Sequence, residues 1–281
     1  ETNNPEIVYK DLLIPIQNIK VYLDFYSLIK SKSKISKINI FSEEVNIDQL
    51  KKIIIKTKPS NLNSLIINKV KHGKLVTNVE LYFNDNLEIA NFIARGEVKK
   101  LNSTINKQLS LQNTSFNFFA DTSDILIKNI KGEMDGLLIK DGNLQITRNE
   151  EIKLKSDFRA EIKINKKNIN NYLPIVKNVT LINQETNLNA NVDNFLNVTF
   201  DKTFKVIDYI YTNKGKINKS LFKTEKPIEN SYLEKDINHF YFKDSNFNAR
   251  YSSDKKNHVY ISGVYSIDDK KYQNYDLKND F

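Results

Sequence analysis

The residues that could perform acid–base or metal chemistry are scattered along this 281-residue chain. None of the three histidines, His72, His239 and His258, lies within five residues of another, and none belongs to an H-E-x-x-H zinc-binding helix motif. The nearest carboxylate pairs are at 43–44 and 121–124, whereas a glycosidase needs two carboxylates about 5–10 Å apart in a cleft. We therefore predict a protein that is not an enzyme, with no metal and no cofactor. The alternative is a carbohydrate-active β enzyme, which would require such a carboxylate pair in a cleft.

Other chemical signatures are missing from the sequence. The chain has no cysteine, which excludes disulfides, thiol nucleophiles and thiolate metal sites. It contains neither the glycine-rich motifs that cradle phosphates nor the G-x-S-x-G nucleophile motif. Function must then be sought in the elements of the fold rather than in a catalytic cluster.

The charge of the chain is positive but evenly distributed. Lysine and arginine total 43 against 34 aspartates and glutamates, a formal net charge of +9. The basic residues are interspersed with acidic ones, which argues against a dedicated nucleic-acid face. Two interpretations stay open. The abundant lysine, asparagine and isoleucine follow an A/T-rich genome, or the positive charge attracts anionic lipid headgroups.

The hydrophobic pattern predicts β-strands almost throughout. In the stretch EIKLKSDFRAEIKIN, residues 151–165, apolar and charged side chains alternate with period 2 over about twice the usual strand length of ~5–6 residues. We expect about 12–15 such strands, joined mostly by hairpin-length turns, in a long, twisted, mainly antiparallel sheet. We also expect a helical turn near 26–33 and a short helix after an N-cap at Asn46 or Asp48.

Glycine positions suggest where the chain turns. Asp141-Gly142 lies between two apolar runs and is typical of a type I′ hairpin turn. A second hairpin is expected near Asn213–Gly215, and Gly96 is expected to mark a bulge or turn. Pro174 is expected to interrupt any long helix in a connector.

The long apolar stripes allow two architectures. In one, a structural or adhesive scaffold, the stripes pack into a closed sandwich or solenoid with a dry core. In the other, the all-β sheet curls into an open groove whose apolar face binds acyl chains. Long even strands, a charged outer face and few helices to cover the inner one favour the open groove. The predicted lipid-binding residues are Leu75, Val79, Leu81, Phe116, Phe118, Ile152, Leu154, Phe158, Ile162 and Ile164.

At this level of pattern the chain resembles a family. IKVYLDFYSLIKSKSKISKINIF resembles the start of AsmA-like proteins, NIDQLKK fits the short helix that often follows, and ILIKNIKGEMDGLLIKDGNLQI with 151–165 resembles the repeating β units of the AsmA, YhdP and TamB group. The resemblance covers about residues 10–200. It rests on pattern rather than on invariant residues, so it transfers no catalytic residue.

The resemblance implies a setting. Proteins of the repeating β-groove group are thought to bridge two membranes for lipids, so phospholipids or other diacyl lipids are the expected partners. The expected location is the periplasm, anchored to the inner membrane of a Gram-negative-type bacterium by a segment missing from this chain. The expected organisation is a disordered or remnant segment at 1–11, an AsmA-like β-groove region at 12–170 and a continuation of the groove at 171–281.

Overall fold

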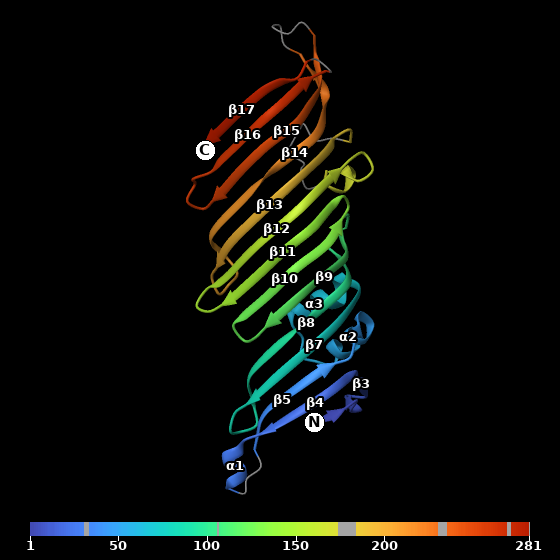
Figure 1. The fold of residues 1–281 in the computed structure, drawn as a ribbon, viewed down its shortest axis with the longest axis vertical. Helices are drawn as coiled ribbons and strands as arrows, with labels where there is room; N and C mark the ends of the chain where they lie inside the picture. Colours follow the sequence, from blue (N-terminus) through green and yellow to red (C-terminus); the bar gives the residue numbers. More distant parts are fainter. Residues whose placement is uncertain (31–33, 106, 174–183, 230–234, 269–270, 281) are drawn as a thin grey trace. The chain divides into compact units, whose positions relative to one another are not determined.

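The computed structural model describes residues 1–30, 34–105, 107–173, 184–229, 235–268 and 271–280. These residues form an all-β protein with a few short helices (Figure 1). The helical segments are α1 (Phe25–Ile29), α2 (Ile47–Ile55), α3 (Asn61–Lys69) and the 3₁₀ turn η1 (Ile169–Asn171).

The strands are longer than average from β7 onward. The first six are β1 (Thr2–Asn3), β2 (Ile7–Tyr9), β3 (Leu12–Ile14), β4 (Ile16–Leu23), β5 (Ile35–Ser42) and β6 (Val45–Asn46). The long ones are β7 (Val70–Phe83), β8 (Ile89–Thr104), β9 (Ser110–Ala120), β10 (Asp124–Met134), β11 (Leu137–Arg148), β12 (Ile152–Ile164), β13 (Asn187–Phe200), β14 (Val206–Ile228), β15 (Ile237–Ser252), β16 (His258–Ile267) and β17 (Gln273–Asp280).

Within the described residues, a single sheet contains 15 strands. Fourteen of them follow one another in the order β1-β4-β5-β7 and then β8 to β17 in sequence, and β6 is paired to β7 beside this path. Consecutive long strands pair antiparallel, as short hairpin connections require. In the part of the chain that is described, the end strands β1 and β17 do not pair with each other, so the sheet is open. This confirms the predicted long antiparallel sheet.

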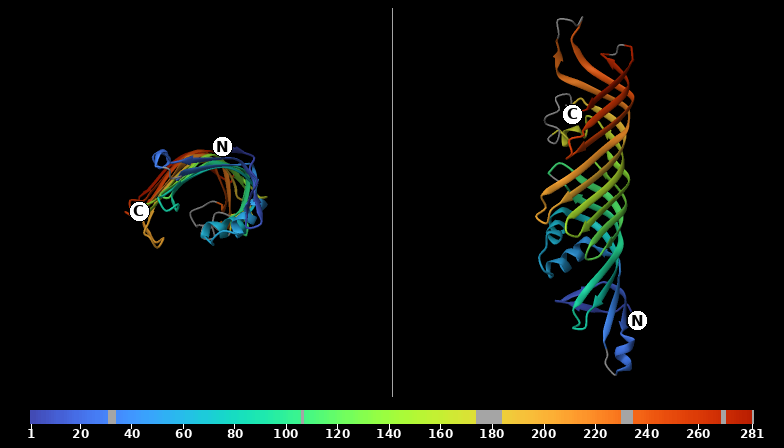
Figure 2. Two further views of the ribbon diagram at one scale, coloured as in Figure 1. Left: turned by 90° about the horizontal axis from the view of Figure 1, so that it is seen from below. Right: turned by 90° about the vertical axis from the view of Figure 1, so that its left-hand side faces the viewer.

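The chain divides into two compact units. Unit 1 comprises residues 1–105, 111–130 and 144–149, and unit 2 comprises 106–110, 131–143 and 150–281. Within unit 2 the strands bend instead of lying flat, and β14 to β17, orange to red, follow an arc in the left-hand view of Figure 2. On the inner side of such a bend side chains crowd together, so small residues are favoured there.

The short helix predicted after an N-cap at Asn46 or Asp48 is confirmed as α2, and Asn46 is its N-cap. The Asn46 side chain accepts a hydrogen bond from Gln49 N at 2.9 Å, and Asn46 N donates to Gln49 Oε1 at 3.0 Å. This reciprocal capping box satisfies two of the backbone donors that a helix start leaves free. The helical turn expected near 26–33 is α1. Helix α3 was not predicted, although Ser60 caps it by accepting from Asn63 N at 3.1 Å.

The hairpin turn predicted at Asp141-Gly142 is wrong, because both residues lie inside strand β11. Gly142 is needed there for space. A Cβ atom built on it would lie 2.3 Å from Cδ1 of Phe158 on the neighbouring strand. Asp141 points to the other face, where its carboxylate is 2.8 Å from Nη2 of Arg159. The glycine marks a close packing contact rather than a turn.

The turn predicted near Asn213–Gly215 is also wrong, since β14 continues through it from Val206 to Ile228. A Cβ on Gly215 would lie 2.0 Å from the backbone oxygen of Asn191 on β13. Gly96 lies within β8, in an unbroken register opposite Thr77, so the bulge predicted there is wrong as well. Its Cβ would lie 2.9 Å from the Phe118 ring. The predicted break at Pro174 lies outside the described residues.

The described residues contain a small hydrophobic core for a protein of 32.8 kDa. The accessible surface of the chain is 18641 Å², about 1.5 times the ~12,500 Å² expected of a compact protein of this mass. Few side chains have almost no exposed surface, among them Ser245 at 0 %, Ser220 and Ile169 at 1 % and Ala190 at 2 %. Most apolar side chains of the sheet are therefore only partly covered.

Candidate functional site

The apolar face of β12 is half-buried along its whole length. Ile152, Leu154, Phe158, Ile162 and Ile164 are neither buried nor fully exposed, and only the small residues between them are buried. The charged residues that alternate with them point to the opposite side of the sheet. The period-2 pattern of the sequence thus separates an apolar face from a charged face.

The register extends this apolar face across unit 2. Strands β12 and β13 pair over thirteen residues without a shift, and Ala160 lies opposite Val192. Val192 lies opposite Gly215 on β14, which lies opposite Phe247 on β15. Residues directly opposite one another share a face. We call the resulting surface the unit 2 face; besides the β12 residues it contains Leu188, Ala190, Val192, Leu196, Val198, Phe200, Ile217, Phe247 and Ile261.

The centre of the unit 2 face is packed and its surroundings are not. Ala160, Ala190 and Val192 form a buried cluster, with the larger side chains Leu137, Ile162, Leu188, Ile217 and Phe247 packed around it. Strands β12 to β17 make their extensive contacts with sheet neighbours, and in the described part of the chain no helix or second sheet packs broadly on them. The large side chains consequently keep part of their apolar surface open.

A short polar chain interrupts the unit 2 face. Asn194 lies opposite Phe158 on one side and Asn213 on the other. The Tyr211 hydroxyl donates to Asn194 Oδ1 at 2.8 Å and accepts from Asn213 Nδ2 at 3.0 Å. These three residues are not among those predicted to bind lipid. The sequence does contain one sign of them. Asn194 stands between Val192 and Leu196 in the period-2 series, where the other residues are apolar.

A second apolar face lies in unit 1. Leu75, Val79 and Leu81 share one side of β7 and are half-buried. Opposite them on β8 lie Val98, Ala94 and Phe92, respectively. Phe118 lies on the same side, because its ring fills the space beside Gly96, the partner of Thr77. Phe116, two residues earlier on β9, is likewise half-buried. Helices α2 and α3 contact β7, whose first residue Val70 is buried.

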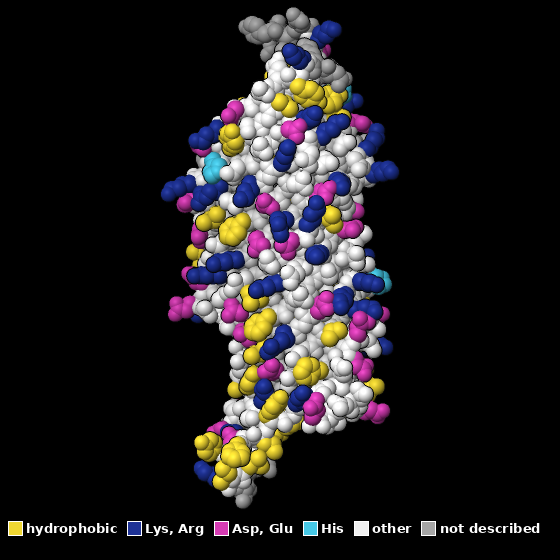
Figure 3. Space-filling view, viewed as in Figure 1, with side chains coloured by type: hydrophobic (Ala, Val, Ile, Leu, Met, Phe, Trp, Pro, Cys, Tyr) yellow, Lys and Arg dark blue, Asp and Glu magenta, His cyan; other side chains and the backbone are white. Residues whose placement is uncertain are grey.

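The charged side of β12 forms an ion-pair network with its neighbours. Glu161 lies 2.8 Å from Lys140 Nζ and 2.6 Å from Lys163 Nζ. Hydrogen bonds from Lys140 and then Lys163 lower the pKa of Glu161 to about 2. In Figure 3, basic and acidic side chains are interspersed over the visible face of the strands. Exposed pairs of this kind contribute little each to stability, because water screens them, but they keep the face soluble.

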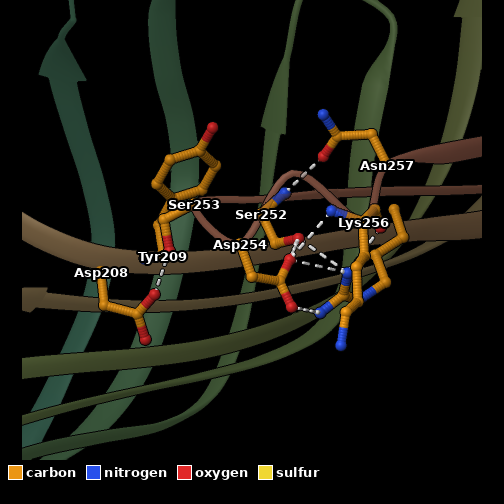
Figure 4. Close-up of polar contacts among 8 residues, drawn as sticks. Asp208, Tyr209, Ser252, Ser253, Asp254, Lys256 and Asn257 are labelled. Carbon is orange, nitrogen blue, oxygen red and sulfur yellow. Dashed lines mark hydrogen bonds and ion pairs between the residues drawn. The ribbon is translucent and has the colours of Figure 1, made fainter. Parts of the chain in front are cut away.

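The densest polar cluster closes the turn between β15 and β16 (Figure 4). Arg250 donates to Ser252 Oγ at 2.7 Å and to the backbone oxygen of Lys256 at 2.6 Å. Ser252 N donates to Asn257 Oδ1 at 2.8 Å. The Ser252 hydroxyl, the Lys256 backbone and Arg250 together hold the pKa of Asp254 well below its usual range. Each of these groups has a partner within the turn, so the cluster organises the hairpin.

The histidines lie on strands β7, β15 and β16. His239 is the one with a carboxylate partner that the structure records: Asp268 accepts from its backbone nitrogen at 2.8 Å and lies 3.1 Å from its Nδ1. Among the described residues, no three histidine or carboxylate side chains converge as the ligands of a metal ion would. Within the same residues, every helix is too short or too polar to cross a membrane.

All ten residues predicted to bind lipid therefore lie on the apolar sides of β7, β9 and β12, each half-buried. The structure groups Leu75, Val79, Leu81, Phe116 and Phe118 in unit 1 and the five β12 residues in unit 2. Comparison with protein-family models, curated proteins and solved structures finds no match to this chain.

Proposed function

We propose that this chain is a non-enzymatic lipid-binding segment whose apolar sheet faces hold the acyl chains of phospholipids or other diacyl lipids. The observation that carries the proposal is that all ten predicted lipid-binding residues are half-buried. They lie on an open sheet, and the protein has an unusually large accessible surface. Large contiguous apolar surface is rare on soluble monomers and marks a ligand or membrane role.

The dimensions of the unit 2 face suit an acyl chain. The row that begins at Ala160 and Val192 continues through Gly215, Phe247 and Ile261 to β17, across six strands. Strands lie about 4.8 Å apart, so the row is about 24 Å long. One leaflet of a bilayer contributes about half of the ~30 Å hydrocarbon core. An extended acyl tail is therefore shorter than the row, and the larger side chains packed around the buried cluster are the ones that it would contact.

The chemistry of the face also suits a mobile ligand. Apolar contact is non-directional, and each buried CH₂ group contributes about 0.8 kcal/mol. A row of interchangeable Ile, Leu, Val and Phe side chains has no fixed register for a tail, so the tail can slide. The polar chain of Asn194, Tyr211 and Asn213 offers hydrogen-bonding side chains on this face.

The resemblance to the AsmA, YhdP and TamB group supports a more specific version of the proposal. In it, the chain is part of a conduit that carries lipids between the inner and outer membranes through the periplasm. The open sheet order and the repeated long antiparallel strands are what such a conduit requires. The family assignment and the location are part of the proposal.

The test is the lipid content of the purified chain. We expect phospholipid to be recovered by solvent extraction and mass spectrometry from the wild-type protein expressed in a double-membraned bacterium. Phe158→Asp with Ile162→Asp places two charges on the unit 2 face, and bound lipid should fall about tenfold or more, because a carboxylate cannot be buried against hydrocarbon unpaired.

The matched control is Lys153→Asp with Lys155→Asp, which introduces two aspartates on the charged side of the same strand. This variant should retain wild-type lipid. Circular dichroism must show that both variants are folded. If the wild-type protein carries no lipid, or if the two double variants retain it equally, the structural or adhesive scaffold becomes the better account.

A further inference from the structure

Helix α1 presents an apolar surface that the rest of the protein leaves uncovered. Four of its five residues are apolar, and none of the five is buried. Phe25 is 71 %, Tyr26 77 % and Ile29 66 % exposed. Leu28 and Leu23, at 44 % and 46 %, extend the same patch. In Figure 1 the helix lies beyond the end of β4, and Figure 3 shows hydrophobic side chains gathered over it.

The exposed helix is a defined element. Asp24 caps it by accepting from Ser27 N at 2.8 Å, and Asp24 N donates to the backbone oxygen of Lys34 at 2.8 Å. The base of the loop between β4 and β5 is therefore closed by hydrogen bonds. The apolar side chains of α1 follow directly after this closure, and none of them is buried.

The sequence around α1 is rich in lysine. Residues 20–37 contain five lysines and a single acidic residue, Asp24, which serves as the helix cap. Lys30 is the exposed C-cap residue of α1. Lys37 lies 4.5 Å from the ring centre of Tyr22 and is ion-paired with Glu80, and Lys20 and Lys34 are ion-paired with Glu1 and Asp85. An apolar tip with aromatic side chains and an exposed lysine at its C-terminal end complements a membrane surface, which is apolar inside and anionic outside.

We propose that α1 docks on a membrane surface that contains anionic lipid, with Phe25, Tyr26, Leu28 and Ile29 inserted among the headgroups and Lys30 at the phosphates. Stable anchoring of a peripheral element requires two signals, and here they are apolar insertion and basic charge. Aromatic side chains favour this interface because one end is apolar and the other tolerates water. A second copy of the chain is a poor occupant, since five residues cannot supply the roughly 1,200–2,000 Å² of a stable dimer.

Vesicle flotation tests this proposal. Wild-type protein should float with phosphatidylcholine vesicles that contain phosphatidylglycerol and much less with pure phosphatidylcholine. Phe25→Ser with Ile29→Ser should weaken binding about tenfold or more, because two apolar side chains no longer insert. Lys30→Glu and added salt should each weaken it further. The matched control is Ile55→Ser with Leu65→Ser, which removes exposed apolar side chains from α2 and α3 and should bind normally.

A fluorescent probe reports insertion directly, because the chain contains no tryptophan. Tyr26→Trp should give an emission blue shift with the anionic vesicles, and Ile55→Trp should not. Equal shifts at both positions, or no shift at position 26, would overturn the proposal. So would light scattering that shows a dimer dissociated by the Phe25 and Ile29 changes.

The outcome is separable from that of the proposed lipid-binding function. Phe158→Asp with Ile162→Asp lies in unit 2 and should leave vesicle flotation unchanged. Phe25→Ser with Ile29→Ser should leave the extracted lipid unchanged. If both pairs of changes abolish both properties, α1 is not an independent docking element.

Discussion

At the scale of single residues, the spacing of small and large side chains decides how the sheet packs. Gly142 faces the Phe158 ring, and Gly96 faces the Phe118 ring. Both phenylalanines belong to the predicted lipid-binding set. Because glycine has no Cβ, each ring can occupy the space beside it on the neighbouring strand.

We predict that Gly142→Ala destabilises the protein by about 1–3 kcal/mol, because overpacking forces the Phe158 ring out of its position. The free energy of unfolding in urea measures this effect. Gly142→Ala combined with Phe158→Leu should recover much of the loss, since the smaller side chain leaves room for the methyl group. A double variant as unstable as the sum of both single variants would contradict the packing explanation.

At the scale of elements, local capping determines where the helices begin. The Asn46–Gln49 capping box starts α2, and an aspartate and a serine start α1 and α3. These caps come from residues close in sequence, so they act before the sheet is assembled. They place α2 beside β6 and β7, where Ile47 and Ile54 are buried.

We predict that Asn46→Ala weakens the start of α2 by about 1 kcal/mol. Because Gln49 N then loses its acceptor, its amide should exchange with solvent roughly fivefold faster, as native-state hydrogen exchange would show. Asn46→Asp keeps an acceptor oxygen and should retain the protection. Equal exchange in both variants would mean that the cap does not hold this turn.

At the scale of the whole molecule, the charged sides of both units make the fold sensitive to acid. Hydrogen bonds lower the pKa of Glu80, chiefly from Tyr82, and of Asp244, chiefly from Lys216. Hydrogen bonds from Lys140 and Lys163 lower the pKa of Glu161 from 4.5 to about 2. A carboxyl group with a lowered folded-state pKa binds fewer protons than it does in the unfolded chain, so stability falls as pH falls.

We predict that the Glu161 contribution is complete above about pH 4.5 and is lost as the pH approaches about 2. The melting temperatures of wild type and Glu161→Gln should therefore differ most near neutral pH and converge in acid, where both side chains are uncharged. A difference that stays constant from neutral pH to pH 2 would show that the ion pairs with Lys140 and Lys163 do not stabilise the fold.

The sequence by itself determined the strands and their two faces. Alternation along 152–164 predicted which side chains share a side, because successive side chains in a strand point to opposite faces whatever the strand pairs with. It also predicted α2 from Asn46, since capping is local. The lipid-binding candidates on β7, β9 and β12 followed from the same period.

Only the tertiary structure decided where the strands turn and what covers their apolar side. The sequence signals at Asp141-Gly142 and near Gly215 are those of hairpin turns. Both glycines nevertheless lie inside strands, where a neighbouring ring or backbone occupies the space that a Cβ would need. Asn194, Tyr211 and Asn213 meet through register between strands, which a single strand's pattern does not contain. Alternation is the same for a covered face and an uncovered one. Whether an apolar side is buried depends on the other layers of the fold, and those are non-local.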